Sequence, residues 1–226
     1  MQYDNSCPIR QQIIDVALKG FQRFGIRQFT MDQLAHEMGM SKRTLYENFA
    51  GKEELLMACM ETNEARHREQ RRKLLSNTNN VLEFILGDLS YSLQHYHHQS
   101  LAFIADLARY PAVVAHVERH REAHGAEAVE FLKRGVEQGV FRPEIDYMVY
   151  YNLVFRQMAM LATQPYFRSL AMKDIFLNVT VVNLRGCCTD RGNRMIDEFL
   201  RQYSSQTETA GTLPDEKKQA EKQVAK

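Results

Sequence analysis

The chain has 226 residues, of which 44% are hydrophobic and 25% charged, and its net charge is +1 at pH 7. These values are ordinary for a soluble globular protein with a sizeable core, and they exclude bulk electrostatic attraction to nucleic acid. No apolar run approaches the length that spans a membrane, and no signal peptide follows Met1. We therefore expect a cytoplasmic protein with no membrane partner.

Apolar residues recur at three- and four-residue spacing through most of the chain, which is the helical signature. Glycine and proline are scarce, and β-branched residues form no alternating runs. We predict an all-α fold followed by a disordered tail over residues 204–226, where no large apolar residue falls in register. The expected helices cover residues 9–24, 31–38, 42–49, 52–75, 82–96, 101–108, 111–138, 146–163, 173–184 and 191–203.

The stretch from Thr30 to Lys52 carries the most informative pattern. Thr30 and Ser41 are typical N-caps of two short helices. The small side chain of Ala35 allows these helices to cross closely, and Gly39 provides the turn between them. This is the construction of a helix-turn-helix, whose second helix enters the major groove of DNA.

The second short helix is expected to direct polar side chains outward. Lysine and arginine donate to guanine O6 and N7, a threonine methyl contacts thymine, and a tyrosine hydroxyl reaches phosphate. Lys52 opposes the dipole of the next helix unless a phosphate binds there. The alternative is that these cations form only a solvated face. The candidate DNA-binding residues are Thr30, Ser41, Lys42, Arg43, Thr44, Tyr46, Asn48 and Lys52.

This stretch resembles the helix-turn-helix of the TetR (tetracycline-repressor-like) family. The chain departs from the family pattern at Arg43, where many members have glycine, and at Asn48, where many have a histidine that contacts phosphate. A weaker resemblance lies in the turn at residues 139–142. The matching residues are Thr30, Ala35, Gly39-Met40-Ser41, Thr44-Leu45-Tyr46, Phe49 and Lys52-Glu53.

The resemblance implies a repressor that binds a near-palindromic double-stranded DNA operator and leaves it when a small-molecule effector binds. It implies a helix-turn-helix domain at residues 1–52 and a helical ligand-binding and dimerisation domain at residues 53–203. Homodimers of the family form through the two C-terminal long helices, although the same residues could fill a monomer core. The candidate dimer residues are Tyr151, Phe155, Met158, Val179, Val182 and Asn183.

Aromatic and aliphatic side chains in the central helices suggest an apolar effector pocket, although core packing explains them equally well. Arg156 lies in an apolar helix, where a buried guanidinium needs a carboxylate partner or an anionic ligand. Internal pairing is the commoner solution. The candidate pocket residues are Phe84, Tyr96, Phe103, Leu107, Phe155 and Arg156.

Two histidine groups raise the alternative of a helical metal- or cofactor-binding protein. A single straight helix supplies only two of the three or four ligands that zinc needs, so we favour solvated histidines and expect no metal or cofactor. A regulator controlled by a protein partner is a further alternative. The two groups are His95, His97 and His98, and His116, His120 and His124.

The four cysteines have neither metal-ligand spacing nor a disulfide pattern, and we expect reduced structural thiols. They are Cys7, Cys59, Cys187 and Cys188. The sequence has no nucleophile elbow, phosphate loop or paired-acid signature. We therefore expect no catalytic residues and no enzyme.

Overall fold

The computed structural model describes residues 8–96, 101–168 and 170–210. Within these ranges the fold is all-α, as predicted, with one isolated bridge between Phe141 and Cys188. None of the described helices is long and apolar enough to cross a membrane. The helices are α1 (Ile9–Phe24), α2 (Met31–Glu37), α3 (Lys42–Asn48), α4 (Lys52–Leu75), α5 (Val81–Tyr96), α6 (Leu101–Leu107), α7 (Pro111–Glu137), α8 (Tyr147–Ala162), α9 (Pro165–Arg168), α10 (Met172–Ile175), the π-helix η1 (Phe176–Thr180), α11 (Val181–Cys187) and α12 (Asp190–Ala210).

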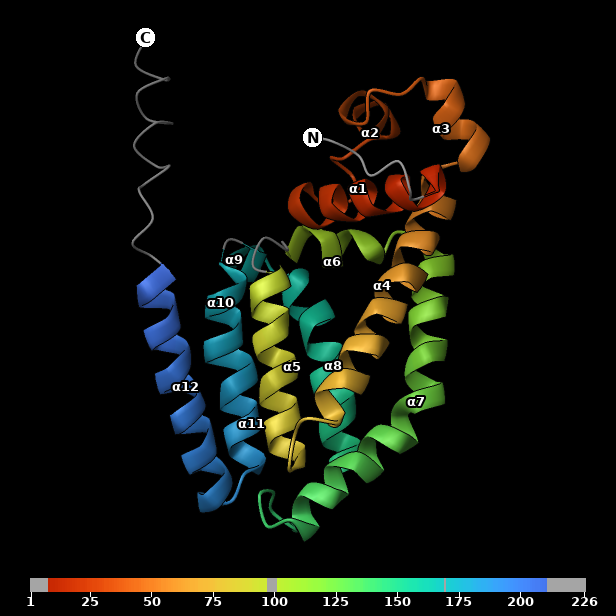
Figure 1. Ribbon diagram of the computed structural model, residues 1–226. Helices are drawn as coiled ribbons and strands as arrows, with labels where there is room; N and C mark the ends of the chain where they lie inside the picture. Colours follow the sequence, from red (N-terminus) through yellow and green to blue (C-terminus); the bar gives the residue numbers. More distant parts are fainter. Residues whose placement is uncertain (1–7, 97–100, 169, 211–226) are drawn as a thin grey trace.

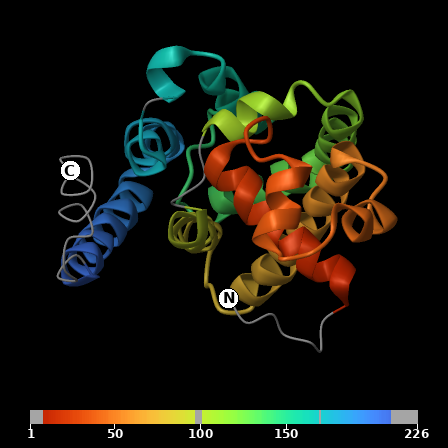
Figure 2. The same ribbon diagram turned by 90° about the horizontal axis from the view of Figure 1, so that it is seen from above.

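Helices α1–α3 form a head, and helices α4–α12 form a body. Figure 1 shows the head across the top of the molecule, with α4 and α7 side by side below it and α12 at the opposite edge. Seen from above, the head lies well away from α12 (Figure 2). Helices α2 and α3 therefore occupy one outer end of the molecule.

The core of the head continues into the body. Leu34 of α2 and Leu45 of α3 are almost completely buried in one cluster. The same cluster contains Leu55 and Leu56 from the first turns of α4, and Phe103 from α6. The orientation of the head is therefore fixed by side chains from both parts of the chain.

Gly20 of α1 permits the closest approach within this core. A Cβ atom at Gly20 would lie 2.3 Å from Cε1 of Phe29. The Phe29 ring in turn packs edge-on against Phe21, with ring centroids 5.8 Å apart. The loop before α2 can lie against α1 only because position 20 has no side chain.

A second core cluster fills the body. The predicted turn after α7 is present, and Gly139 adopts a φ of +70° there. The Arg142 N–H donates to the carbonyl of Cys187 at 2.9 Å. Val140 and Phe141 are buried beside the end of α11. This turn therefore joins the end of α7 to the end of α11.

The helical boundaries differ from the prediction in the last third of the chain. In place of the single helix expected at 173–184, the chain forms α10, η1 and α11 in direct succession. The π-helical segment η1 could not be predicted, because it does not change the spacing of the apolar residues. The last helix was expected to end at Tyr203, and it continues to Ala210. Extending an existing helix adds one hydrogen bond per residue and needs no apolar contact. The rest of the expected tail lies outside the described residues.

The described cysteines are free and buried, which confirms the prediction of structural thiols for Cys59, Cys187 and Cys188. Burial raises the pKa of the Cys59 thiol to about 12. Cys59 therefore stays protonated and unreactive in the head core. Cys7 lies outside the described residues.

We expect Gly20→Ala to destabilise the protein, because the new methyl group collides with the Phe29 ring. Overpacking of this kind costs about 1–3 kcal/mol, or about 2–4 °C in Tm per kcal/mol for a chain of this size. Thermal unfolding followed by circular dichroism measures the change. Gly51→Ser is the control, because Gly51 has extended backbone and open space around it. An unchanged Tm for Gly20→Ala would contradict the packing argument.

Candidate nucleic-acid interface

Side-chain caps hold the starts of α2 and α3. The Gln33 N–H donates to Oγ1 of Thr30 at 3.2 Å, and the Thr30 N–H donates to Oε1 of Gln33 at 2.7 Å, which confirms the predicted capping box. The Thr44 N–H donates to Oγ of Ser41 at 3.0 Å. The hydroxyls of Thr30 and Ser41, both candidate DNA-binding groups, thus accept hydrogen bonds from backbone N–H groups.

The turn between the two helices is tight. Gly39 has a φ of +62°, a conformation that favours glycine. The Met40 N–H donates to the Ala35 carbonyl at 3.0 Å. Ala35 and Leu45 are buried where α2 and α3 approach each other. The predicted helix-turn-helix is therefore present, with α3 as its second helix.

The two cations at the start of α3 are exposed and paired with neighbouring acids. Nζ of Lys42 lies 2.6 Å from Oδ2 of Asp32 on α2, and Nε of Arg43 lies 2.9 Å from Oε1 of Glu47. Exposed pairs of this kind contribute only about 0.2–1 kcal/mol. A DNA phosphate or base edge can therefore compete with these acids for the cations.

Of the remaining candidates on α3, one side chain faces solvent and another is hydrogen-bonded to the backbone. Tyr46 is half exposed. Asn48 is partly buried, and its Nδ2 donates to the Thr44 carbonyl at 2.8 Å. The Asn48 amide is therefore already engaged in a local contact.

Lys52 lies apart from α3, at the first position of α4. Its ammonium nitrogen is 5.8 Å from the centroid of the Phe21 ring. Partial burial lowers the pKa of Lys52, and the nearby Asp106 carboxylate opposes this shift. Lys52 thus interacts with both the head and α6.

Asp106 on α6 is a linking residue that the sequence analysis missed. Its Oδ2 accepts a hydrogen bond of 2.8 Å from the N–H of Arg27, in the loop between α1 and α2. It also attracts Lys52. An acid at the end of a short helix has no distinctive sequence pattern, because its partners lie far away along the chain.

Arg10 is a second residue that the sequence analysis missed. Its guanidinium lies 4.0 Å from the centroid of the Phe49 ring and donates to the Asn48 carbonyl. It also pairs with Glu54 on α4 at 3.3 Å. Arg10 therefore ties the C-terminal end of α3 to α1 and α4.

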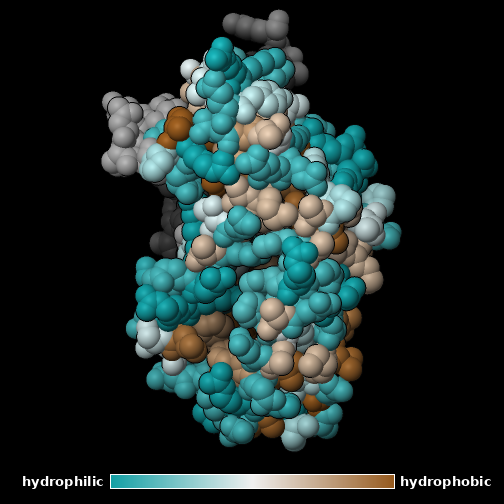
Figure 3. All heavy atoms as spheres, turned by 90° about the vertical axis from the view of Figure 1, so that its right-hand side faces the viewer, coloured by the Kyte–Doolittle hydropathy of each residue, from teal (hydrophilic) through white to brown (hydrophobic). Residues whose placement is uncertain are grey.

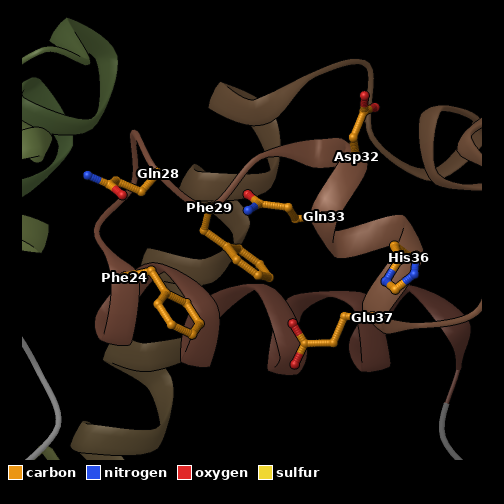
Figure 4. Close-up of a pocket in the computed structure, with 7 residues that line it drawn as sticks. All are labelled: Phe24, Gln28, Phe29, Asp32, Gln33, His36 and Glu37. Carbon is orange, nitrogen blue, oxygen red and sulfur yellow. The ribbon is translucent and has the colours of Figure 1, made fainter. Parts of the chain in front are cut away.

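A groove of about 740 Å³ lies beside α2 on the head (Figure 4). The rings of Phe24 and Phe29 stack within it at 6.0 Å. Its lining includes the acids Asp32 and Glu37 and no residue of α3. Carboxylates repel phosphate, so this groove is a poor surface for DNA.

The candidate pocket residues do not gather in one place. Phe103 is buried in the head cluster and Leu107 packs against it. Phe84 meets Phe131 of α7 edge-on at 5.0 Å. Phe155 lies beside Tyr151, with ring centroids 6.2 Å apart. Tyr96 ends α5, and its side chain lies outside the described part of the structure.

Arg156 is paired and exposed. Its Nη2 lies 3.5 Å from Oε2 of Glu118 on α7, so an internal carboxylate partner is present. The side chain is 61% exposed, which corrects the expectation that it is buried. The apolar residues around it in sequence lie on more than one face of α8.

The three histidines of α7 contact carboxylates. Nε2 of His116 lies 3.1 Å from both oxygens of Glu64, and Nδ1 of His120 lies 3.8 Å from one of them. His124 contacts Glu127. No group of three or more potential ligands suited to a metal ion occurs among the described residues. His97 and His98 lie outside them, as does the side chain of His95.

The face that carries α4 and α7 is predominantly hydrophilic, with apolar residues scattered over it (Figure 3). Several cations of α4 are paired with acids: Arg71 with Asp88 of α5 at 2.9 Å, and Arg72 with Glu69 at 2.9 Å. The outer end of the head remains the candidate interface.

Comparison with known proteins agrees with this geometry. Residues 13–59 match the family model described as bacterial regulatory proteins, tetR family. The helix-turn-helix head therefore matches the TetR family. This match and the relatives below indicate that the chain is a DNA-binding transcriptional regulator. The matched residues span the head and the first turns of α4.

Relatives and solved structures extend the similarity into the body. The HTH-type transcriptional repressor KstR2 of Mycobacterium tuberculosis is 28% identical over 155 residues, covering 64% of this chain and 75% of the relative. The structure of this ketosteroid transcriptional regulator has a TM-score of 0.58 at 22% identity, covering 83% of this chain and 98% of that one. A TetR-family regulator from Agrobacterium tumefaciens has a TM-score of 0.63 at 17% identity, covering 80% and 100%. These relatives are transcriptional regulators, not enzymes.

We expect Asp106→Asn to lower the pKa of Lys52 further. The substitution removes the attraction that opposes the effect of burial, so the ammonium loses its proton at a lower pH. An NMR titration of the lysine side chains measures the change. Asp174→Asn on α10 is the control, because Asp174 is an exposed acid elsewhere on the body. A raised or unchanged pKa in Asp106→Asn would show that Asp106 does not act on Lys52.

Proposed function

We propose that the chain is a homodimeric repressor that binds a near-palindromic operator and is released by a small-molecule effector. The observation that carries this proposal is the pair of capped short helices at the outer end of the head, which expose Lys42 and Arg43. In a helix-turn-helix dimer the spacing of the half-sites matches the spacing of the two second helices. The candidate residues Thr30, Ser41, Thr44, Tyr46, Asn48 and Lys52 would position α3 on the DNA backbone or base edges.

A face of α8 supports the dimer. Val149, Leu153 and Met160 are 64%, 53% and 63% exposed, and they recur at helical spacing together with Arg156. Val182 of α11 is 58% exposed. Large apolar side chains gathered on one side of a protein favour burial against a partner. A second copy of the chain is the partner that a two-fold operator requires.

The dimer interface proposed here, the seam, consists of Val149, Leu153, Arg156, Met160 and Val182, and it differs from the set of residues suggested by the sequence. Tyr151 and Phe155 face α7, where Tyr151 approaches Gly125 and Phe155 lies 5.8 Å from the Arg121 guanidinium. Asn183 donates to Gln157 at 2.6 Å. Val179 packs against a small cluster in the body. Val182 stays in the proposed seam, and the side chain of Met158 lies outside the described part.

The proposal that an effector releases the DNA is based on the resemblance to the TetR family and on the relatives described above. The relative KstR2 is described as a ketosteroid transcriptional regulator, which favours an apolar small molecule as the class to test. We propose that such a molecule binds the body and changes the spacing of the two heads. A thermal-shift screen of apolar compounds, followed by release of bound DNA, tests this step. Stabilising compounds that leave the DNA bound would count against it.

We expect the triple variant Lys42→Ala, Arg43→Ala, Lys52→Ala to lose binding to DNA from upstream of its own gene in mobility-shift assays. Each lost phosphate contact also lowers the salt slope by about one. The control changes the same number of exposed cations on the body to alanine. These are Arg119, Lys133 and Lys173. Equal binding by both triple variants would place the interface elsewhere.

We expect Leu153→Glu to convert the dimer into monomers, because each chain would bury an unpaired carboxylate in the proposed interface. Sedimentation velocity measures the change, and operator affinity should fall with it. Leu75→Glu is the matched control, because Leu75 is 52% exposed but lies at the far end of α4. A monomeric parent protein, or a dimer that survives Leu153→Glu, would reject this seam.

A further inference from the structure

We propose that Glu47 is a positioning residue that fixes Arg43 for the recognition of guanine in each half-site. This inference rests on the proposed function and names the base that α3 reads. Glu47 itself touches the Arg43 side chain through Oε1, at 2.9 Å from Nε. Arg43 would make the base contact.

The geometry of the pair leaves the recognition end of Arg43 free. Its Nε is engaged by Glu47, and no described side chain accepts a hydrogen bond from its two Nη groups. The Arg43 side chain is 89% exposed. A guanidinium presents a rigid fork, and two of its N–H groups match O6 and N7 of guanine. A carboxylate behind the fork restricts its rotation and lowers the entropy lost on binding.

The charge order of α3 is unfavourable for the helix itself. Lys42 and Arg43 lie at the N-terminal end of α3, where the helix dipole favours acidic side chains. Glu47 lies in the last turn, where the dipole favours basic side chains. An acid that precedes its basic partner by four residues stabilises a helix better than the reverse order present here. Helix stability therefore gives little reason for this arrangement, whereas base recognition gives one.

Other side chains of α3 are less free to read bases. Lys42 pairs with Asp32 of the neighbouring helix at 2.6 Å, and its ammonium is a point charge without the planar fork of a guanidinium. The amide of Asn48 donates to the Thr44 carbonyl. Arg43 is therefore the exposed cation of α3 whose Nη donors have no partner among the described side chains.

An acid on a DNA-facing helix also carries a cost that gives a distinctive signature. The Glu47 carboxylate repels nearby phosphates and weakens binding to every sequence. If its role is to position Arg43, its removal should weaken base discrimination without weakening general affinity. A purely structural role would instead lower affinity for all sequences together.

The test is selection of bound duplexes from a random-sequence DNA pool, using the full chain and its Glu47→Ala variant. We expect the parent to enrich a guanine in each half-site. We expect Glu47→Ala to lower this preference by about tenfold, the effect of one good bidentate contact, while affinity for mixed-sequence DNA is maintained or raised. Arg43→Lys should lose the same preference, and Arg43→Ala combined with Glu47→Ala should lose no more than Arg43→Ala alone. Glu61→Ala, an exposed acid on α4, is the control.

The outcomes separate the two proposals. A parent protein that enriches no sequence would overturn the proposed function and this inference with it. A parent that enriches a site whose base preferences are unchanged in Glu47→Ala would overturn the positioning role alone. Circular dichroism verifies the fold of each variant. If Glu47→Ala unfolds, two other variants provide the test. Arg43→Lys should lose the guanine preference. Glu47→Gln should retain it, because its amide oxygen still accepts a hydrogen bond from Nε of Arg43.

Discussion

Burial of the first turns of α4 inside the head is the constraint on which the rest of the structure depends. Helices α2 and α3 have seven residues each, too few to be stable alone in water. They persist because Leu34, Leu45 and Phe49 are buried together with Leu55 and Leu56 of α4. Because α4 has 24 residues and runs on into the body, any movement of the body reaches the head through a continuous helix.

Stability and binding are divided between different residues of the helix-turn-helix. Hydroxyl caps at Thr30 and Ser41 satisfy free N–H groups at the helix starts, and buried apolar residues hold the helices together. The exposed cations contribute little to stability and are placed against the dipole of α3. A helix stabilised by its caps and its core can tolerate an unfavourable charge order on its outer face. That face is then available for DNA.

Contacts between distant segments attach this end of the molecule to the body. Asp106 connects α6 to the loop after α1, and Arg10 connects α1 to the end of α3 and to α4. Further down, Glu64 of α4 meets His116 and His120 of α7. Each contact joins residues that are at least 38 positions apart in the chain. Together these polar contacts attach the head to α4 and α6, and attach α4 to α7.

The sequence alone determined the all-α class, the approximate starts of most helices and the helix-turn-helix, because caps, turn glycines and apolar spacing are local features that act within a few residues. It also indicated which side chains of α3 point outward. The tertiary structure decided which partners those side chains have: Asp32 for Lys42, Phe21 and Asp106 for Lys52, and Glu118 for an exposed Arg156. It likewise separated Phe84 from Phe103 and turned Tyr151 and Phe155 toward α7. Periodicity states that a residue lies on a helical face, but only the packing of whole helices determines what that face meets.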